Sequence, residues 1–235
     1  MIEQNKDMTS DNETLTQPIP FIPSYFPKTL MQQKYRFFKV PKNLPTEWNK
    51  DDSLEHIKVL NNGLRIEYIG PGVNIWRDAA AIRANHPIPS EVGFYYFEVN
   101  IIDKGSRGNI GVGLTKKNVP LNQMPGWVPI SYGYHGDDGL AFKKGQGSEY
   151  GPLYSAGDTI GCGINYYDRT IFFTKNGINL GIAFNNVSNK ELYPVIGLIS
   201  KGECVEANFG AMPFKFDITF YSKEILLWET SIGNI

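Results

Sequence analysis

The chain has 235 residues, with 23 lysine and arginine residues against 24 aspartate and glutamate residues, and a formal net charge of −1. Such a balance gives no basic field that would collect nucleic acid, and the longest apolar runs are too short to cross a bilayer. The polar N-terminus lacks the apolar core of a secretory signal peptide. We therefore expect a protein of the cytoplasm, or of the nucleus, that binds neither nucleic acid nor membrane.

The first 44 residues do not have the pattern of a globular fold. Residues 1–17 are polar and non-periodic, which predicts a disordered tail. Residues 18–27 alternate prolines with aromatic and aliphatic side chains, so a central strand or helix is excluded there. We interpret this segment as an extended strap over an apolar patch of the body, with a ligand for another protein as the alternative. A short helix is predicted over 28–38.

Residues 45–216 predict one all-β domain. Short runs of β-branched and aromatic residues are separated by glycine, asparagine, aspartate and proline, as in an antiparallel sandwich or barrel. Two turns should join neighbouring strands, at Asn61-Asn62-Gly63 and at Asn176-Gly177, because asparagine and glycine tolerate positive φ. The predicted strands are 54–60, 64–69, 94–102, 109–114, 158–166, 170–174, 180–184, 192–199 and 204–209.

Alternation within these strands predicts which side chains form the core. In 94–102, the odd-numbered positions from Tyr95 to Ile101 are apolar and should face inward. Glycines alternate at 111 and 113 and again at 161 and 163, which leaves one face of each strand without side chains. We expect a backbone or an aromatic ring to pack closely against both faces.

Two long segments lack a strand pattern and are interpreted as surface loops. The first, residues 70–89, carries Trp76, and its alanines 79–81 could form one helical turn. The second, residues 116–129, contains Trp127 after Pro-Gly. Long loops in a compact domain are usually functional or disordered, and an exposed tryptophan is costly unless it binds something. If the two loops meet, the tryptophans would form one shallow pocket.

The remaining expectations concern the thiols and the C-terminus. Cys162 and Cys204 lie in predicted strands, and we expect them to be buried and reduced. Within the C-terminal segment 217–235, residues 222–232 predict a short closing helix with Ser222 as its N-cap and with Ile225, Leu226 and Trp228 packed inward.

The sequence shows no catalytic constellation. It lacks a G-x-S-x-G elbow, a phosphate-binding loop and facing carboxylates for glycoside cleavage. His135, Asp137 and Asp138 could ligate a cation, but no further ligand stands at a suitable spacing. A structural turn, in which the carboxylates accept backbone N–H bonds, is favoured instead. We expect no metal and no cofactor.

Several motifs resemble those of a SPRY domain. They are D-A-A-A-I-R-A-N-H-P-I-P (78–89), G-F-Y-Y-F-E-V (93–99), P-G-W (125–127), S-Y-G-Y-H-G-D-D-G (131–139), G-D-T-I-G-C (157–162), F-T-K-N-G (173–177), L-G-I-A-F (180–184), L-Y-P-V-I-G-L (192–198) and E-A-N-F-G (206–210). The subgroup they resemble is the RanBPM type, Ran-binding proteins 9 and 10. The resemblance implies a sandwich of two antiparallel sheets that binds short peptides without catalysis. It also implies a scaffold role in a ubiquitin ligase of the GID or CTLH type, although nothing after Phe216 resembles the LisH, CTLH and CRA regions of such scaffolds.

Carrying the family's binding surface onto the matching motifs gives the predicted site. We expect a monomer that binds a short linear peptide of another protein, with ligase subunits among the candidate partners. A carbohydrate- or small-ligand-binding sandwich is the alternative, and a divergent hydrolase is the least favoured hypothesis. Tyr132 and Tyr134 could equally be core residues. The predicted peptide-binding residues are Trp76, Arg77, Asp78, Arg83, Trp127, Tyr132, Tyr134, Lys201 and Glu203.

Overall fold

The computed structural model describes residues 43–74, 76–187 and 191–222. The predicted tail, strap and helix within residues 1–42 lie outside the described residues. So do Ile225, Leu226 and Trp228 of the predicted closing helix. Within the described part of the chain, no helix is long and apolar enough to span a membrane.

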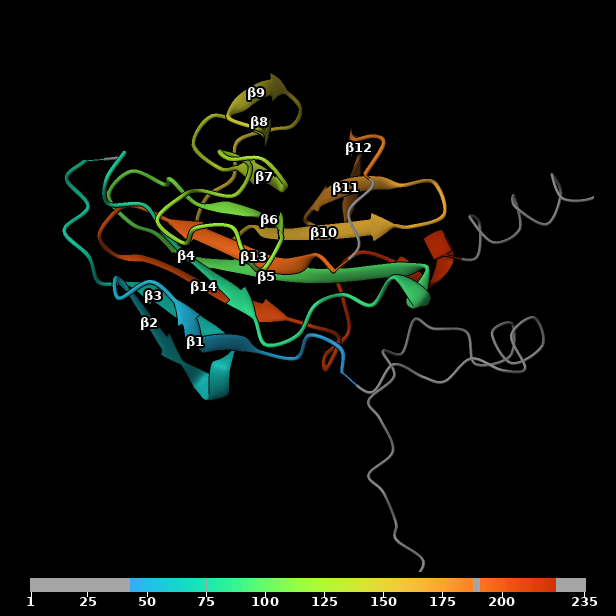
Figure 1. The fold of residues 1–235 in the computed structure, drawn as a ribbon, viewed down its shortest axis with the longest axis horizontal. Coiled ribbons are helices and arrows are strands. Elements are labelled where there is room, and N and C mark those ends of the chain that lie inside the picture. The colour runs from blue at the N-terminus through green and yellow to red at the C-terminus, as the bar shows by residue number, and fades with distance from the viewer. Residues whose placement is uncertain (1–42, 75, 188–190, 223–235) are drawn as a thin grey trace, which may run out of the picture.

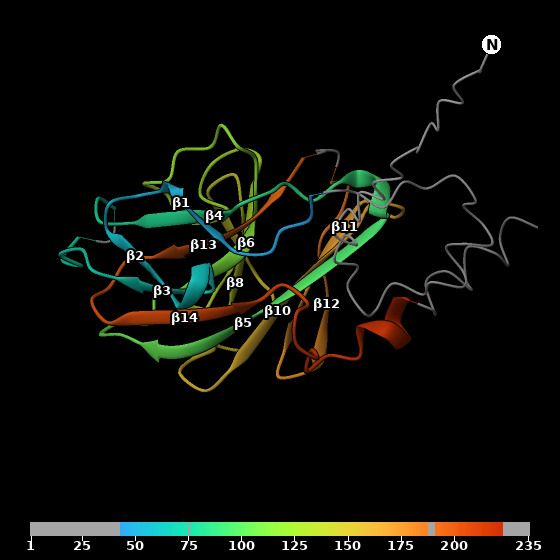
Figure 2. The same cartoon turned by 90° about the horizontal axis from the view of Figure 1, so that it is seen from below.

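Two seven-stranded antiparallel sheets form the molecule, which confirms the predicted all-β sandwich (Figures 1 and 2). The first sheet has the order β1 (Trp48–Ser53), β4 (Ala80–Ala84), β13 (Tyr193–Leu198), β6 (Gly111–Thr115), β7 (Ser131–His135), β8 (Leu140–Lys143), β9 (Gln146–Glu149). The second has the order β12 (Ile178–Phe184), β11 (Thr170–Lys175), β10 (Thr159–Asn165), β5 (Phe94–Lys104), β14 (Glu203–Asn208), β3 (Arg65–Tyr68), β2 (Ile57–Leu60). Two 3₁₀ turns, η1 (Asn61–Gly63) and η2 (Ser90–Val92), lie in the connections.

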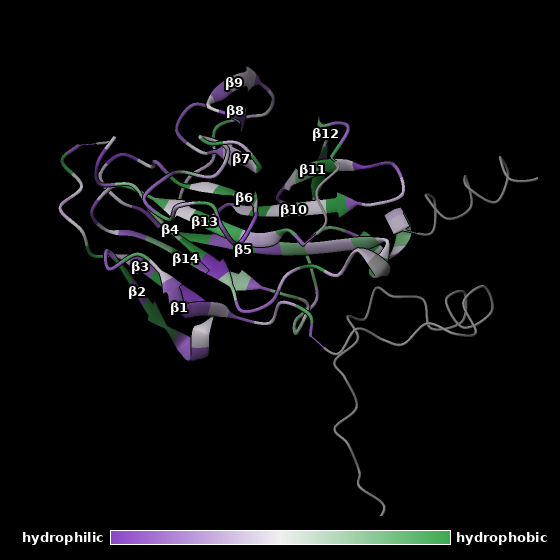
Figure 3. Ribbon diagram, viewed as in Figure 1, coloured by the Kyte–Doolittle hydropathy of each residue, from purple (hydrophilic) through white to green (hydrophobic). Residues whose placement is uncertain are grey.

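The core lies between the sheets, where the predicted alternation is confirmed. Tyr95, Phe97, Val99 and Ile101 of β5 are all buried in one apolar cluster. Cys162 of β10 pairs with Phe97 and faces the same way. Figure 3 shows hydrophobic residues concentrated in the strands and hydrophilic residues in the connecting loops, as burial of apolar side chains requires.

Both predicted turns join hairpins. Asn61 and Asn62 have φ of 48° and 50° between β2 and β3, and Asn176 and Gly177 have φ of 52° and 83° between β11 and β12. The left-handed conformation that selects asparagine and glycine is therefore present at each turn.

The first predicted loop is wrong in its second half. Alanines 79–81 do not form a helical turn, because Ala80–Ala84 is strand β4, paired between β1 and β13 and buried along its whole length. A strand covered on both faces shows no apolar–polar alternation, which is why the pattern was absent. Residues 48–53, which had no strand pattern either, form β1 at the edge of the same sheet.

The alternating glycines receive close neighbours, as predicted. In the first sheet the backbone of the neighbouring strand lies close, and a Cβ at Gly113 would stand 1.9 Å from the Tyr132 carbonyl oxygen. On the outer face of the second sheet an aromatic ring fills the space, and a Cβ at Gly163 would stand 2.1 Å from Phe172. No side chain fits at either distance, so glycine is required at both positions.

Part of the outer face of the second sheet is covered by the chain's own residues 214–222. A buried carboxylate fixes this covering segment, because Glu98 accepts hydrogen bonds from the Lys215 and Phe216 amides, both at 3.0 Å, and from the Tyr96 hydroxyl at 2.9 Å. Aromatic packing completes the contact, between Phe94, Tyr96 and Phe172 on the sheet and Phe214, Phe216 and Tyr221 on the segment.

The closing helix begins earlier than predicted. Helical residues start at Ile218, and the Asp217 carboxylate accepts the Phe220 amide at 2.9 Å. Ser222 lies inside the helix, where its hydroxyl donates to the Thr219 carbonyl at 3.0 Å. Asp217 is therefore the N-cap, and the assignment of Ser222 was wrong.

Both cysteines are free thiols. Cys162 is buried, as predicted, and burial raises the pKa of its thiol. Cys204 is only partly buried, so the expectation of two buried thiols is wrong for the second.

Candidate functional site

Trp76 and Trp127 lie in contact at one end of the sandwich. Trp76 belongs to the connection between β3 and β4, and Trp127 to the connection between β6 and β7. Their ring centroids are 5.2 Å apart with the planes inclined by 37°. Trp76 is 71% exposed, whereas Trp127 is half-buried on a small apolar cluster of Ala79, Met124 and Ile199. The two loops meet, as the sequence analysis anticipated.

Asp78 shapes the loop that presents Trp76. Its Oδ2 accepts the Val73 amide at 2.7 Å and the Asn74 amide at 2.8 Å. These backbone donors, that of Asn74 first, hold the pKa of Asp78 below its usual value. The Asn74 side chain in turn accepts the Trp76 amide at 2.9 Å. Asp78 therefore positions the loop, and this contact accounts for it better than direct binding of a peptide.

The Pro-Gly-Trp turn is fixed by short-range contacts. Gly126 has φ of 89°, and a Cβ there would stand 2.2 Å from the Phe142 carbonyl oxygen. Its amide donates to the Ser131 hydroxyl at 2.8 Å, and the Trp127 amide donates to the Met124 carbonyl at 3.1 Å. Trp127 is thus held by its backbone as well as by the apolar cluster beneath it.

Three exposed cations lie on the elements around the tryptophan pair. Arg77 follows Trp76 directly, and Lys201 lies in the turn between β13 and β14. Arg107, which the sequence analysis left out of the site, donates from Nη2 to the Val73 carbonyl at 3.4 Å. The Ser106 amide also donates to the Lys201 carbonyl at 3.2 Å, so the three segments form one surface. The only signal for Arg107 was its place in a glycine-flanked turn.

Four predicted site residues are buried, which corrects their assignment. Tyr132 and Tyr134 face the core, where Tyr132 packs on Phe184 with centroids 5.2 Å apart and Tyr134 packs on Phe173 at 5.4 Å. Since the Tyr132 and Tyr134 side chains both point between the two sheets, neither contributes to the outer surface. The other two, Arg83 and Glu203, are 3% and 0% exposed.

Arg83 forms a buried ion pair. Its Nε and Nη2 donate to the two carboxylate oxygens of Asp52 at 2.8 and 2.9 Å, and its Nη1 donates to the Val119 carbonyl at 2.8 Å. This fork ties β4 to β1 and to the β6–β7 loop. The guanidinium is used within the fold.

Glu203 holds the turn that carries Lys201. Its carboxylate accepts the Ile199 amide at 2.7 Å, the Ser200 amide at 2.9 Å and the Ser200 hydroxyl at 2.5 Å. Burial nevertheless dominates these contacts and raises the pKa of Glu203 from 4.5 to about 7.

This raised pKa predicts a pH-dependent stability. Between pH 4.5 and 7 the folded protein holds a proton that the unfolded chain has released. The stabilisation from Glu203 is therefore complete below about pH 4.5 and is lost as the pH rises through 7. We expect the melting temperature of the wild type to fall relative to that of Glu203→Gln over this window, in thermal scans at half-unit steps. Parallel pH profiles would contradict the assignment.

In the turn after β7, only Asp138 accepts a hydrogen bond from the backbone of a neighbouring strand, whereas Asp137 accepts one from a side chain. Asp138 accepts the Leu140 amide at 2.9 Å, and Asp137 accepts the Asn109 side-chain amide. His135 is buried, which lowers its pKa, and its Nε2 donates to the Pro125 carbonyl at 2.8 Å. The three side chains place potential ligand atoms within 4.8 Å of one another. That no metal is required stays a prediction.

Replacing Asp138 tests the structural role. Asp138→Ala leaves the Leu140 amide without its acceptor and should lower the free energy of unfolding by about 1 kcal/mol. Chemical denaturation measures the loss. The wild type should melt at the same temperature with and without EDTA, and a lower melting temperature in EDTA would assign the turn to a metal.

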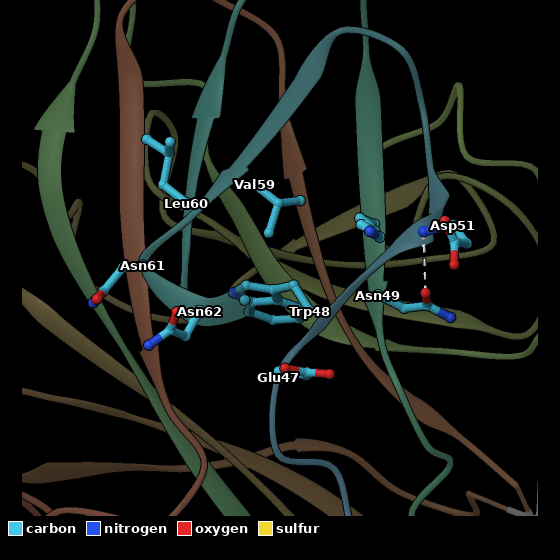
Figure 4. Close-up of a pocket in the computed structure, with 10 residues that line it drawn as sticks. Glu47, Trp48, Asn49, Asp51, Val59, Leu60, Asn61 and Asn62 are labelled. Carbon is cyan, nitrogen blue, oxygen red and sulfur yellow. Dashed lines mark hydrogen bonds between the residues drawn. The ribbon is translucent and has the colours of Figure 1, made fainter.

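A hollow in the surface of the described residues lies elsewhere. It has a volume of about 490 Å³ and lies between β1 and the β2–β3 hairpin, with the buried Trp48 in its wall (Figure 4). Its rim is polar and includes Glu47, Asn49, Asp51 and Asn62. None of the predicted site residues lines this hollow, so the hollow does not support binding at the Trp76–Trp127 pair.

Comparison with known proteins extends this description. The SPRY domain family model matches residues 94–212. Ran-binding protein 10 of Danio rerio is 48% identical over 82% of this chain and 31% of its own length, and Ran-binding protein 9 of Homo sapiens is 48% identical over 80% and 25%. Ran-binding protein M homolog of Arabidopsis thaliana is 36% identical over 77% and 38%. The chain thus spans about a third of the length of these curated relatives.

Solved structures agree on the fold. A human SPRY domain superimposes with a TM-score of 0.59 at 35% identity, over 68% of this chain and 98% of that domain. The SPRY domain of human HERC1 gives the same TM-score at 24% identity, over 71% and 99%, and supports the fold alone.

Proposed function

Because the chain belongs to the SPRY domain family, we propose that it is a non-catalytic protein-interaction module that binds a short extended segment of a partner protein. The observation that carries the proposal is the contact between Trp76 and Trp127, with Trp76 71% exposed. Water disfavours so large an exposed apolar surface, and a partner side chain placed on it would remove that cost. Exposed aromatic anchors of this kind dominate the affinity of many interfaces.

The charges around the pair define the partner further. Arg77, Arg107 and Lys201 are exposed beside the tryptophans, while the nearby carboxylate of Asp78 is engaged by backbone amides. We propose that the bound segment has an apolar anchor residue and acidic flanking residues. Exposed charges fix orientation more than affinity, so salt should weaken binding only moderately.

The wider roles that similarity to these relatives suggests are proposals for this chain. The similarity to Ran-binding proteins 9 and 10 supports a scaffold role, such as that of a GID or CTLH ubiquitin ligase, in the cytoplasm or nucleus. It extends over about a third of those relatives, so the partners of their other regions are not carried over. We place the module at residues 45–216, and we propose that it acts as a monomer.

A direct comparison of ligand classes tests the function. The purified protein is applied to an array of short peptides, acidic and basic in equal number, and to a glycan array. We expect acidic peptides with an aromatic or aliphatic anchor to bind the wild type and to be lost with Trp76→Ala. Binding to glycans alone would support a carbohydrate-binding sandwich and would overturn the proposal.

A further inference from the structure

Strand β12 is one of the two edge strands of the second sheet, with β2 at the other edge. It pairs with β11 on one side, and no described residue pairs with its other side. Figures 1 and 2 place it at the opposite end of the molecule from the β3–β4 connection that carries Trp76. A partner bound at β12 would therefore be separate from a partner bound at the Trp76–Trp127 pair.

The described residues form four edge strands in the sandwich, and β12 differs from the other three. Natural edge strands are protected by charge, shortness or bulges. Strand β1 carries Lys50, Asp51 and Asp52 and changes register along its length, and β2 has four residues with an exposed Lys58. Strand β9 is short, polar and wholly exposed. Strand β12 also changes register against β11, but it has seven residues, I-N-L-G-I-A-F, without a charge or a proline.

The edge exposes apolar side chains on both faces of the sheet. Ile178 is 68% exposed and pairs with Lys175, whose Nζ donates to the Leu153 carbonyl at 2.7 Å. Leu153 is itself 58% exposed, so it adds to this side. Ile182 is 55% exposed and pairs with Phe172 of the outer aromatic cluster.

The edge is also held in place before any partner arrives. The Tyr150 hydroxyl enters the irregular part of the β11–β12 ladder, where it donates to the Gly181 carbonyl at 2.7 Å and accepts the Phe173 amide at 2.9 Å. The Asn179 side chain accepts the Gly181 amide at 2.9 Å. A partner that pairs with β12 would meet an ordered strand, and little conformational entropy would be lost on the protein's side.

We propose that β12 binds an extended, uncharged segment of a partner protein, which adds to the second sheet as an eighth strand. Backbone hydrogen bonds supply the pairing, and apolar side chains on both faces of the segment cover Ile178 and Ile182. The charge pattern sets this chemistry. Because β12 is uncharged and Asp158 neutralises Lys175 at 3.2 Å, a charged segment would lose hydration without gaining a partner.

The size of the edge favours a peptide over a second copy of the chain. A seven-residue strand is about 23 Å long, and a sheet layer is about 10 Å thick, which gives roughly 230 Å² for each partner. Stable dimers bury about 800 Å² on each side. A β12–β12 contact alone falls far short of that area, whereas a single extended segment needs no more.

A random library of displayed ten-residue peptides tests the proposal. It is selected on the wild type and counter-selected on Ile182→Lys, and Ile178→Lys serves as a second edge variant. We expect uncharged sequences rich in β-branched residues whose affinity falls at least tenfold with either variant. The control Ile102→Lys changes a 43% exposed isoleucine on β5, a strand paired on both sides, and should leave affinity unchanged. Melting curves establish that every variant is folded.

Three further measurements decide between explanations. A selected peptide resynthesised with N-methyl groups on the alternate amides that face β12 should lose binding, because those amides can no longer donate to the β12 carbonyls. Trp76→Ala should bind the selected peptides as the wild type does, which separates this surface from the proposed function.

If every selected peptide is charged, or keeps its affinity for Ile182→Lys, the proposal is wrong. Self-association of the wild type in sedimentation velocity that Ile182→Lys abolishes would assign the edge to a second copy and would equally overturn it.

Discussion

Replacing Arg83 with methionine should lower the free energy of unfolding by about 3 kcal/mol. The substitution removes the guanidinium from Asp52, whose side chain is 11% exposed, and leaves the Val119 carbonyl without its donor. Breaking a buried ion pair from one side usually costs 3–5 kcal/mol, and the remaining Lys117 contact at 2.6 Å places the expectation at the lower end. Denaturant unfolding at pH 7 measures the change.

The electrostatics of Asp52 agree with the direction of this effect. Burial alone would raise the pKa of Asp52, but hydrogen bonds from Arg83 and Lys117 bring it below the usual value. The matched control is Arg65→Met, since Arg65 forms an ion pair with Glu206 at 2.9 Å with both side chains partly exposed. The control should cost less than about 1 kcal/mol. Equal losses in the two variants would show that the Arg83 pair contributes no more than a surface pair.

Replacing Trp76 with alanine should reduce affinity for the partner segment about thirtyfold, which corresponds to roughly 2 kcal/mol. Because the side chain is 71% exposed, the melting temperature should stay within about a degree of the wild type. Isothermal titration with a peptide from the array measures the affinity. Trp127→Ala should lose both affinity and stability, since Trp127 also packs on Met124 and Ile199.

An exposed aromatic residue outside the site provides the control. Phe220 is 59% exposed on the segment that follows the last strand, and Phe220→Ala should bind the partner with unchanged affinity. Wild-type affinity in Trp76→Ala would remove Trp76 from the interface. A loss of affinity in Phe220→Ala as large as that in Trp76→Ala would indicate a general response to removed apolar surface.

The strands that the sequence predicted are those with one recognisable core face or a strong turn. Alternation in 94–102 and the Asn-Gly turn at 176–177 correspond directly to β5 and the β11–β12 hairpin. Strand β4 gave no such signal, because three of its five residues are alanines and a fourth is Arg83. The pairing of Arg83 with Asp52, 31 residues away, is a tertiary contact that no local pattern contains.

The sequence identified candidate site residues where a large side chain lay in a loop and had no evident role in the core. Trp76 and Trp127 stood out for that reason, and they meet in the structure. Tyr132 and Tyr134 were ambiguous because both faces of β7 are covered, one by the opposite sheet and the other by the segment around Pro125. Glu203 looked like a surface acid, and only the fold shows that its carboxylate accepts backbone amides.

The hydrogen bonds to the buried Glu98 carboxylate determine how long a fragment must be if this domain is to fold when it is fused to another protein. The family match ends at residue 212, and the last strand of the described residues, β14, is complete by then. A chain cut there would nevertheless lose the Lys215 and Phe216 amides that Glu98 binds and would bare the aromatic rings of β5 and β11 to water. The folding unit therefore extends beyond the last strand of the two sheets. Gene fusions that keep the segment through residue 222 should yield soluble protein, and those that stop at the last strand should aggregate.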